Sequence, residues 1–169
     1  MDEKLAQFKN LGKLMSLSNT EGYAKTLGLE AVDVEIGKVV MKLHYHNDLI
    51  VSPQTGVIAG GAVTALLDSC AGSVSITTLE PMGVTATIDL RIDYLRLPAP
   101  SKTIYAEVEV VRTTKYVVFT RGVAWQEKDK PLAYATGNFV NNPMLPVMKE
   151  MLFGNTKLVD QLTLRQGNY

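Results

Sequence analysis

Cysteine is almost missing from this chain of 169 residues, because Cys70 is the only one. A single cysteine excludes an intramolecular disulfide framework and fits a protein that works in a reducing compartment. Net charge is missing too, since 17 basic residues balance 17 acidic residues. A chain with no net charge lacks the electrostatic footprint of a nucleic-acid or membrane-surface binder. We therefore expect neither nucleic acid nor a membrane among its partners.

Long uninterrupted hydrophobic runs are also missing. The N-terminal sequence MDEKLAQFKN begins with acids and contains no apolar segment typical of a signal peptide. Residues 57–79 are rich in apolar residues, but Gly, Ser and Thr interrupt them and Asp68 lies near their centre, which argues against a membrane helix. The sequence therefore predicts a soluble cytoplasmic protein. Its length is that of one domain, and no linker or internal repeat divides it.

The stretch from Val51 to Leu79 organises the chain. It contains one formal charge, Asp68, and a Gly60-Gly61 step that opens a run of small and apolar residues. After Gly61 the larger apolar residues recur at three- and four-residue spacing, which predicts a helix. The opposite side carries alanine, serine and glycine instead of the lysine and glutamate of a solvated face. We therefore expect protein to enclose this helix on most sides.

Asp68 requires an explanation in such a helix, because a buried and unpaired carboxylate costs several kcal/mol. One interpretation is structural, in which Asp68 bonds a nearby hydroxyl or backbone N–H and fixes the helix. The other is catalytic, and Gly60-Gly61 favours it. Glycine lets a ligand approach the unpaired N–H groups of a helix N-terminus closely. Such groups stabilise the oxyanion that forms when a carbonyl is attacked.

The spacing between these groups has a consequence for assembly. Gly60 and Asp68 are eight residues apart, which is about 12 Å along an α-helix. That distance is too long for both groups to touch one carbonyl from the same helix. If they share a substrate, Asp68 must meet Gly60 of a second copy, which predicts a symmetric dimer with two equivalent sites.

Strand patterns surround the central helix. Alternation predicts a hairpin over residues 29–46, with a turn at Gly37-Lys38, and four strands over residues 84–94, 103–112, 116–126 and 132–140. Short links between the four strands predict an antiparallel meander. The simplest packing wraps one curved antiparallel sheet around the central helix, an α+β fold.

Helical patterns occupy both ends of the chain. They predict helices over residues 2–17 and 20–27, a helix over residues 144–154 and a weaker segment over residues 157–165. The predicted organisation is a single domain over residues 1–169, with a core at about 29–140, N-terminal helices in 1–28 and a helical tail in 141–169.

Two other groups of residues are not predicted to be functional sites. His44 and His46 lie two residues apart with Asp48 close behind, but no Cys or Glu cluster joins them, so no metal site is predicted. Cys70 follows Asp68 by two residues on the helix and no histidine is placed to activate it. We interpret Cys70 as a small core residue and not as a nucleophile.

Two motifs point to a family. One is Gly56-Val57-Ile58-Ala59-Gly60-Gly61, followed by Asp68, and the other is the strand TIDLRIDYL at residues 87–95. Together they resemble the hotdog-fold acyl-CoA thioesterases of the phenylacetate-pathway (PaaI) type, over about residues 29–140. The resemblance implies a curved sheet wrapped around one long helix. It also implies a homodimer with a continuous sheet, often paired into a tetramer.

The resemblance implies a reaction, the hydrolysis of an acyl thioester to a free acid and coenzyme A (CoA). Asp68 would be the nucleophile or general base, and Gly60 of the other subunit would donate to the oxyanion. Thr87 and Gln54 would hold the attacking water. No metal or redox cofactor is implied, and CoA enters only as part of the substrate.

The substrate itself needs further contacts. Gly61 and Ala59, at the start of the helix, would lie beside the bound thioester. The phosphates of CoA need cations, for which Arg96, Arg112 and Lys115 are candidates because they lie near strand ends and turns. Each of these three residues also fits the role of an ordinary solvated charge.

Three positions depart from the family pattern. Ala59 replaces the usual His, and Thr87 replaces a Ser but keeps the hydroxyl. Pro53 replaces the common Asn, and the side-chain amide of the next residue, Gln54, is the candidate to take its place. These departures leave open a non-catalytic acyl-CoA binding or assembly module, which would bind CoA without turnover. A hotdog dehydratase or hydratase ranks third, because it needs a His paired with an acid across the site. Acyl length is not predicted.

Overall fold

The computed structural model describes residues 22–79 and 83–143. The predicted helices over residues 2–17 and 144–154, and the segment over 157–165, lie outside the described residues. The described chain begins with a short helix, α2 (Gly22–Leu27), in the place of the second predicted N-terminal helix. None of the described helices is both long and apolar enough to cross a membrane.

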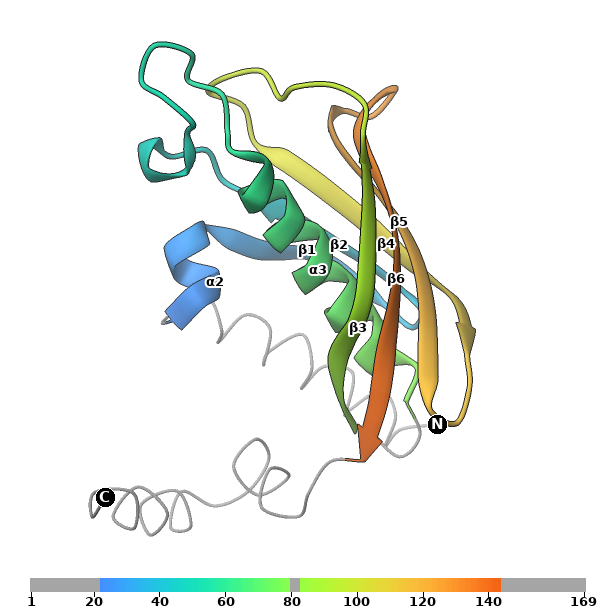
Figure 1. Ribbon diagram of the computed structural model, residues 1–169. Helices are drawn as coiled ribbons and strands as arrows, with labels where there is room; N and C mark the ends of the chain where they lie inside the picture. The colour runs from blue at the N-terminus through green and yellow to red at the C-terminus, as the bar shows by residue number, and fades with distance from the viewer. Residues whose placement is uncertain (1–21, 80–82, 144–169) are drawn as a thin grey trace, which may run out of the picture.

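One antiparallel sheet and one long helix make up the core (Figure 1). The elements that follow α2 are β1 (Leu29–Glu35), β2 (Lys38–Leu43), the 3-10 turn η1 (Asn47–Leu49), α3 (Gly60–Thr77), β3 (Gly83–Tyr94), β4 (Ile104–Thr113), β5 (Val117–Glu127) and β6 (Lys130–Pro143). The predicted α+β fold is therefore confirmed, with α3 packed against β2, β3, β4 and β5. The strand bounds agree with the alternation pattern to within three residues. The hairpin turn, predicted at Gly37-Lys38, lies one residue earlier, at Ile36-Gly37, and Lys38 is the first residue of β2.

The predicted meander is wrong at one connection. The strand order is β1-β2-β4-β5-β6-β3, so β3 pairs with β6 at an edge of the sheet and not with β4. The neighbour of β4 on its other side is β2, with Leu43 opposite Ile104. Alternation identifies strands without naming their neighbours, and only about two-thirds of sequential strands pair or adjoin. The link after Tyr94, which contains Pro98 and Pro100, connects β3 to a strand on the far side of β5 and β6.

The periodic apolar face of α3 forms one side of the core. Its buried residues are Ala62, Val63, Leu66, Leu67, Cys70, Ala71, Val74 and Ser75. The sheet contributes buried residues that include Val39, Leu43, Ile104, Val108, Val118 and Phe139. The opposite face of α3, which carries Asp68 and Gly72, is only half-buried within the described chain. The sheet therefore covers the apolar face of α3, and the expectation that protein also encloses the opposite face stays a prediction.

Candidate active site

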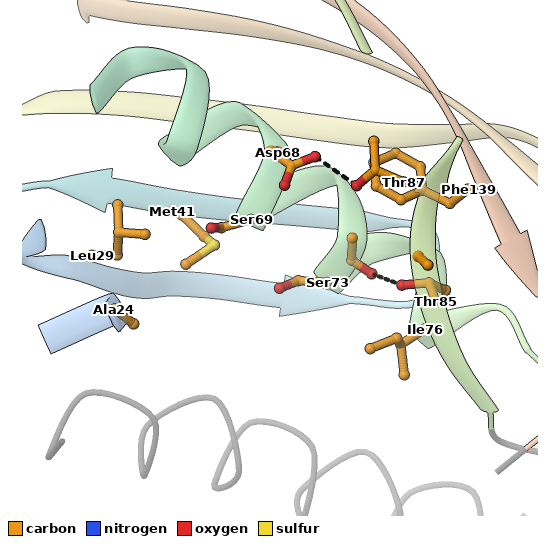
Figure 2. Close-up of a pocket in the computed structure, with 12 residues that line it drawn as sticks. Ala24, Leu29, Met41, Asp68, Ser69, Ser73, Ile76, Thr85, Thr87 and Phe139 are labelled. Atoms are coloured by element: carbon orange, nitrogen blue, oxygen red, sulfur yellow. Dashed lines mark hydrogen bonds between the residues drawn. The ribbon is translucent and has the colours of Figure 1, made fainter. Parts of the chain in front are cut away.

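Asp68 lies in the middle of α3, on the half-buried face next to the edge strand β3. The hydroxyl Oγ1 of Thr87, from β3, donates a hydrogen bond of 2.8 Å to Oδ1 of Asp68 (Figure 2). Within the described part of the chain no hydrogen bond reaches the second carboxylate oxygen, Oδ2. The structure therefore brings together two of the residues that the sequence selects, and it leaves one carboxylate oxygen available.

A pocket of about 340 Å³ opens beside this pair. Its polar side is formed by Asp68, Thr85 and Thr87, and Figure 2 shows Leu29 and Met41 on the other side of α3 from β3. The remaining lining residues are small or apolar: Ala24, Ser69, Gly72, Ser73, Ile76, Ala86 and Phe139. Sites for small molecules in proteins have volumes of about 300–1,000 Å³ and mostly apolar walls. The pocket is therefore suited to an apolar group whose reactive end lies at Asp68.

The N-terminus of α3 carries the other predicted group. Gly60 and Gly61 are exposed, and the residue before them, Ala59, has extended backbone and no side-chain cap (φ −61°, ψ 139°). The first N–H groups of a helix have no partner inside the helix. Because alanine cannot cap them, these N–H groups are suited to bind an anionic oxygen.

Tyr94 holds this helix end in place, a role that its position in the sequence does not reveal. Its hydroxyl donates to the carbonyl oxygen of Gly60 at 2.8 Å. The Thr64 hydroxyl donates to the same oxygen at 3.2 Å and lies 2.7 Å from the Tyr94 hydroxyl. One strand, β3, therefore contacts α3 near Asp68 through Thr87 and at Gly60 through Tyr94. Alternation along residues 84–94 reveals the strand but not these contacts.

The other predicted residues are not brought to Asp68. Gln54 is exposed in the loop before α3 and does not line the pocket. Arg96 follows the end of β3 and lies beside the start of β6, where its backbone N–H donates to the carbonyl of Leu132. Lys115, between β4 and β5, lies beside the other end of β6, where its carbonyl accepts from the side chain of Asn141, and Arg112 is the next-to-last residue of β4. The structure therefore does not gather the three cations into one phosphate site within a single chain.

The histidines lie outside the pocket. His44 and His46 follow the end of β2 instead of belonging to a strand. His44 lies 2.9 Å from the carboxylate of Glu30, and this hydrogen bond, together with Lys42, lowers the pKa of Glu30. In residues 22–79 and 83–143 there is no group of three or more His, Cys, Asp or Glu arranged to hold a metal ion. This part of the chain offers no His paired with Asp68.

Cys70 points into the core. Its Sγ donates to the carbonyl of Val39 at 3.4 Å, and burial raises the pKa of the thiol to about 12. A thiol that remains protonated at neutral pH is a weak nucleophile. The interpretation of Cys70 as a core residue therefore agrees with its surroundings.

Comparison with known proteins gives the family. Residues 55–133 match the model of the Thioesterase superfamily. A curated protein of Halobacterium salinarum, named "Putative esterase", is 33% identical over 103 residues, which cover 59% of this chain and 66% of that protein, just under two thirds. A crystal structure of a Pseudomonas aeruginosa protein is 31% identical, covers 79% of this chain and 98% of its own, and has a TM-score of 0.68.

Two solved structures with lower identity show the same fold. A thioesterase from Haemophilus influenzae is 17% identical with a TM-score of 0.71, over 80% of this chain and 92% of its own. The Escherichia coli PaaI protein of the phenylacetic acid degradation operon is 16% identical with a TM-score of 0.67, over 82% of this chain and 99% of its own. The predicted hotdog fold is confirmed, and the chain belongs to the thioesterase superfamily, a family of thioester hydrolases.

Proposed function

We propose that the protein hydrolyses acyl thioesters of CoA. The observation that carries this proposal is the Asp68–Thr87 pair, joined by a 2.8 Å hydrogen bond at the side of an apolar pocket of about 340 Å³. Thioester hydrolysis needs space for the acyl group, a base or nucleophile at its carbonyl end, and a donor for the oxyanion. The pocket, Asp68 and the glycine end of α3 match these needs, and family membership supports the reaction class.

In this proposal Asp68 starts the reaction from its Oδ2 atom. It either attacks the thioester carbon directly or takes a proton from a water molecule that attacks. A C–O bond forms, the carbonyl electrons move onto oxygen, and they return as the C–S bond breaks. When Asp68 acts as a base, the proton that it takes from water passes to the departing thiolate of CoA. When Asp68 attacks directly, the acyl group forms an anhydride with it, a water molecule then hydrolyses this anhydride, and a proton of that water goes to the thiolate. Either route consumes one water and restores Asp68. The Thr87 hydroxyl fixes Oδ1 and thereby aims Oδ2.

The oxyanion donor in this proposal is Gly60 of the partner subunit. The separation of Gly60 and Asp68 along α3, about 12 Å, argues against a site within one subunit. In the described sheet β3 lies at an edge and carries Thr87. An exposed edge strand is a template for pairing with another chain. Pairing of two copies along β3 would form the continuous sheet that the family resemblance implies.

The alternative function is acyl-CoA binding without turnover. Ala59 in place of a histidine supports it, because no imidazole is available at the start of α3 to orient the substrate. The exposed position of Gln54, away from the pocket, supports it as well. A dehydratase is less consistent with the site, because neither His44 nor His46 is among the pocket-lining residues.

Thiol release from a panel of acyl-CoAs tests the proposed function. The panel contains acetyl-, butyryl-, octanoyl-, palmitoyl- and phenylacetyl-CoA, and a thiol reagent measures free CoA. We expect release from at least one member, at a rate that grows in proportion to enzyme concentration. If no member releases CoA while calorimetry detects CoA binding to the folded protein, the alternative function replaces the proposed one.

Substitution of Thr87 tests its part in the mechanism. Thr87→Val keeps the shape but removes the hydroxyl that donates to Asp68. A hydrogen bond to a charged group contributes about 1.5–3 kcal/mol, so kcat/KM for the best substrate should fall about tenfold or more. Thr87→Ser restores the hydroxyl and should retain most of the activity. Equal activity in the Val and Ser variants would show that this hydroxyl does not serve the reaction.

A further inference from the structure

The pocket continues past Asp68 along one stripe of α3. Residues four apart on a helix lie one above the other. Asp68, Gly72 and Ile76 form such a stripe, and all three line the pocket. A group attached to a carbonyl at Asp68 and extending toward Ile76 therefore passes over Gly72.

Gly72 lines the pocket where α3 faces Thr85 of β3 and Phe139 of β6. A Cβ atom at Gly72 would lie 3.8 Å from Cε1 of Phe139 and 3.8 Å from Oγ1 of Thr85. Both contacts are ordinary van der Waals distances, so an alanine fits here without any clash. Thr85 also donates to the carbonyl oxygen of Gly72 at 3.3 Å, which fixes this strand against this turn of the helix. Since a Cβ would already contact these two residues, a larger side chain would have to turn away from them, into the rest of the pocket.

Packing against the described residues gives no reason for a glycine at this position. Glycine destabilises the interior of a helix relative to alanine, and Gly72 lies well inside α3 (Gly60–Thr77). Other glycines of the chain have a structural reason, as at Gly122, where a Cβ would lie 2.6 Å from Cγ2 of Val108. Among the described residues, a Cβ at Gly72 would touch Phe139 and Thr85 at ordinary van der Waals distance, and a longer side chain would extend into the pocket that these residues line.

The chemistry of the pocket limits what occupies it. Among the described residues that line it, Asp68 is the only charged one. Leu29, Met41 and Ile76 supply apolar surface away from the Asp68–Thr87 pair. An acyl group with its own carboxylate would meet no cation here and would be repelled by Asp68. The pocket therefore fits an uncharged apolar acyl group.

We propose that Gly72 sets the length of the acyl group that the enzyme accepts. Its missing side chain lets an uncharged acyl group extend from Asp68 toward Ile76. This inference rests on the proposed function, and it assigns to Gly72 a role in specificity and none in the chemical step.

Two variants test this role, Gly72→Ala and Gly72→Leu. For each, kcat/KM is measured with acetyl-CoA, whose acyl group ends before Gly72, and with octanoyl-CoA, whose acyl group passes it. We expect the octanoyl-to-acetyl ratio of kcat/KM to fall a few-fold in Gly72→Ala and about tenfold or more in Gly72→Leu, in line with steric selection in apolar pockets. Acetyl-CoA is the control within each variant, and the melting temperature of Gly72→Ala should not fall.

A binding measurement separates this inference from the proposed function. Calorimetry measures the affinities for octanoyl-CoA and for free CoA. Each Gly72 substitution is combined with Asp68→Asn, so that octanoyl-CoA is not hydrolysed during the measurement. In that background the octanoyl-to-CoA affinity ratio should fall with Gly72→Leu. Wild-type ratios in both folded Gly72 variants would overturn the inference even if hydrolysis occurs. A loss that is equal for acetyl- and octanoyl-CoA would overturn it too, whereas a wild type that binds but never hydrolyses contradicts only the proposed function.

Discussion

Replacement of Asp68 by asparagine should lower kcat/KM for acyl-CoA hydrolysis at least about a hundredfold, which is a loss of about 2.7 kcal/mol of transition-state stabilisation. Asparagine has the shape of aspartate, and its amide oxygen can still accept the hydrogen bond from Thr87. It cannot attack a thioester carbon or take a proton from water. Thiol release with the best substrate of the panel measures the change.

The same variant distinguishes a catalytic Asp68 from a structural one. If Asp68 only fixes α3 through Thr87, asparagine keeps that hydrogen bond, so activity and melting temperature should both stay close to those of the wild type. If Asp68 performs the chemistry, activity should fall while the melting temperature and the affinity for acyl-CoA stay close to those of the wild type. Activity within tenfold of the wild type, in a folded protein, would exclude Asp68 as the nucleophile or base.

The elements of the fold were largely predictable from the sequence, because each has its own period. The apolar spacing after Gly61 predicts α3, and strict alternation over residues 84–94 predicts β3 almost to its ends. Pairing was not predictable in this way. Nothing in the alternation indicates that the strand ending at Tyr94 lies beside the last strand, since both edges of an antiparallel strand offer the same backbone groups.

The candidate site, too, was predictable only in part. Asp68 is visible because a single charge in an apolar stretch requires an explanation, and the family resemblance supplies Thr87. The pocket is not visible, because Leu29, Met41 and Phe139 come from three strands and each has the pattern of an ordinary core residue. The role of Gly72 is not visible in the sequence either, since a glycine among alanines and serines does not indicate that its position on the helix faces a pocket.

Substitution of Gly60 by proline should lower kcat about a hundred- to a thousandfold, the usual effect of removing one oxyanion donor. Proline lacks the N–H but is well tolerated at the first position of a helix, and Ala59 already has the extended backbone that precedes a proline. Gly60→Ala is the matched control, because it keeps the N–H and its Cβ would lie 3.6 Å from the Tyr94 hydroxyl, an ordinary contact. The alanine variant should lose much less activity.

A mixed dimer of Asp68→Asn and Gly60→Pro subunits tests whether the two groups meet across an interface. If Asp68 of one subunit works with Gly60 of the partner subunit, the mixed dimer contains one site with both defects and one site with neither. Dimers purified through two different tags should then recover about half of the wild-type activity per dimer, although each parent is nearly inactive. No recovery would contradict the shared site. With both parents nearly inactive, that result would mean that each site takes Asp68 and Gly60 from the same subunit, and it would overturn the argument from the roughly 12 Å of helix between them.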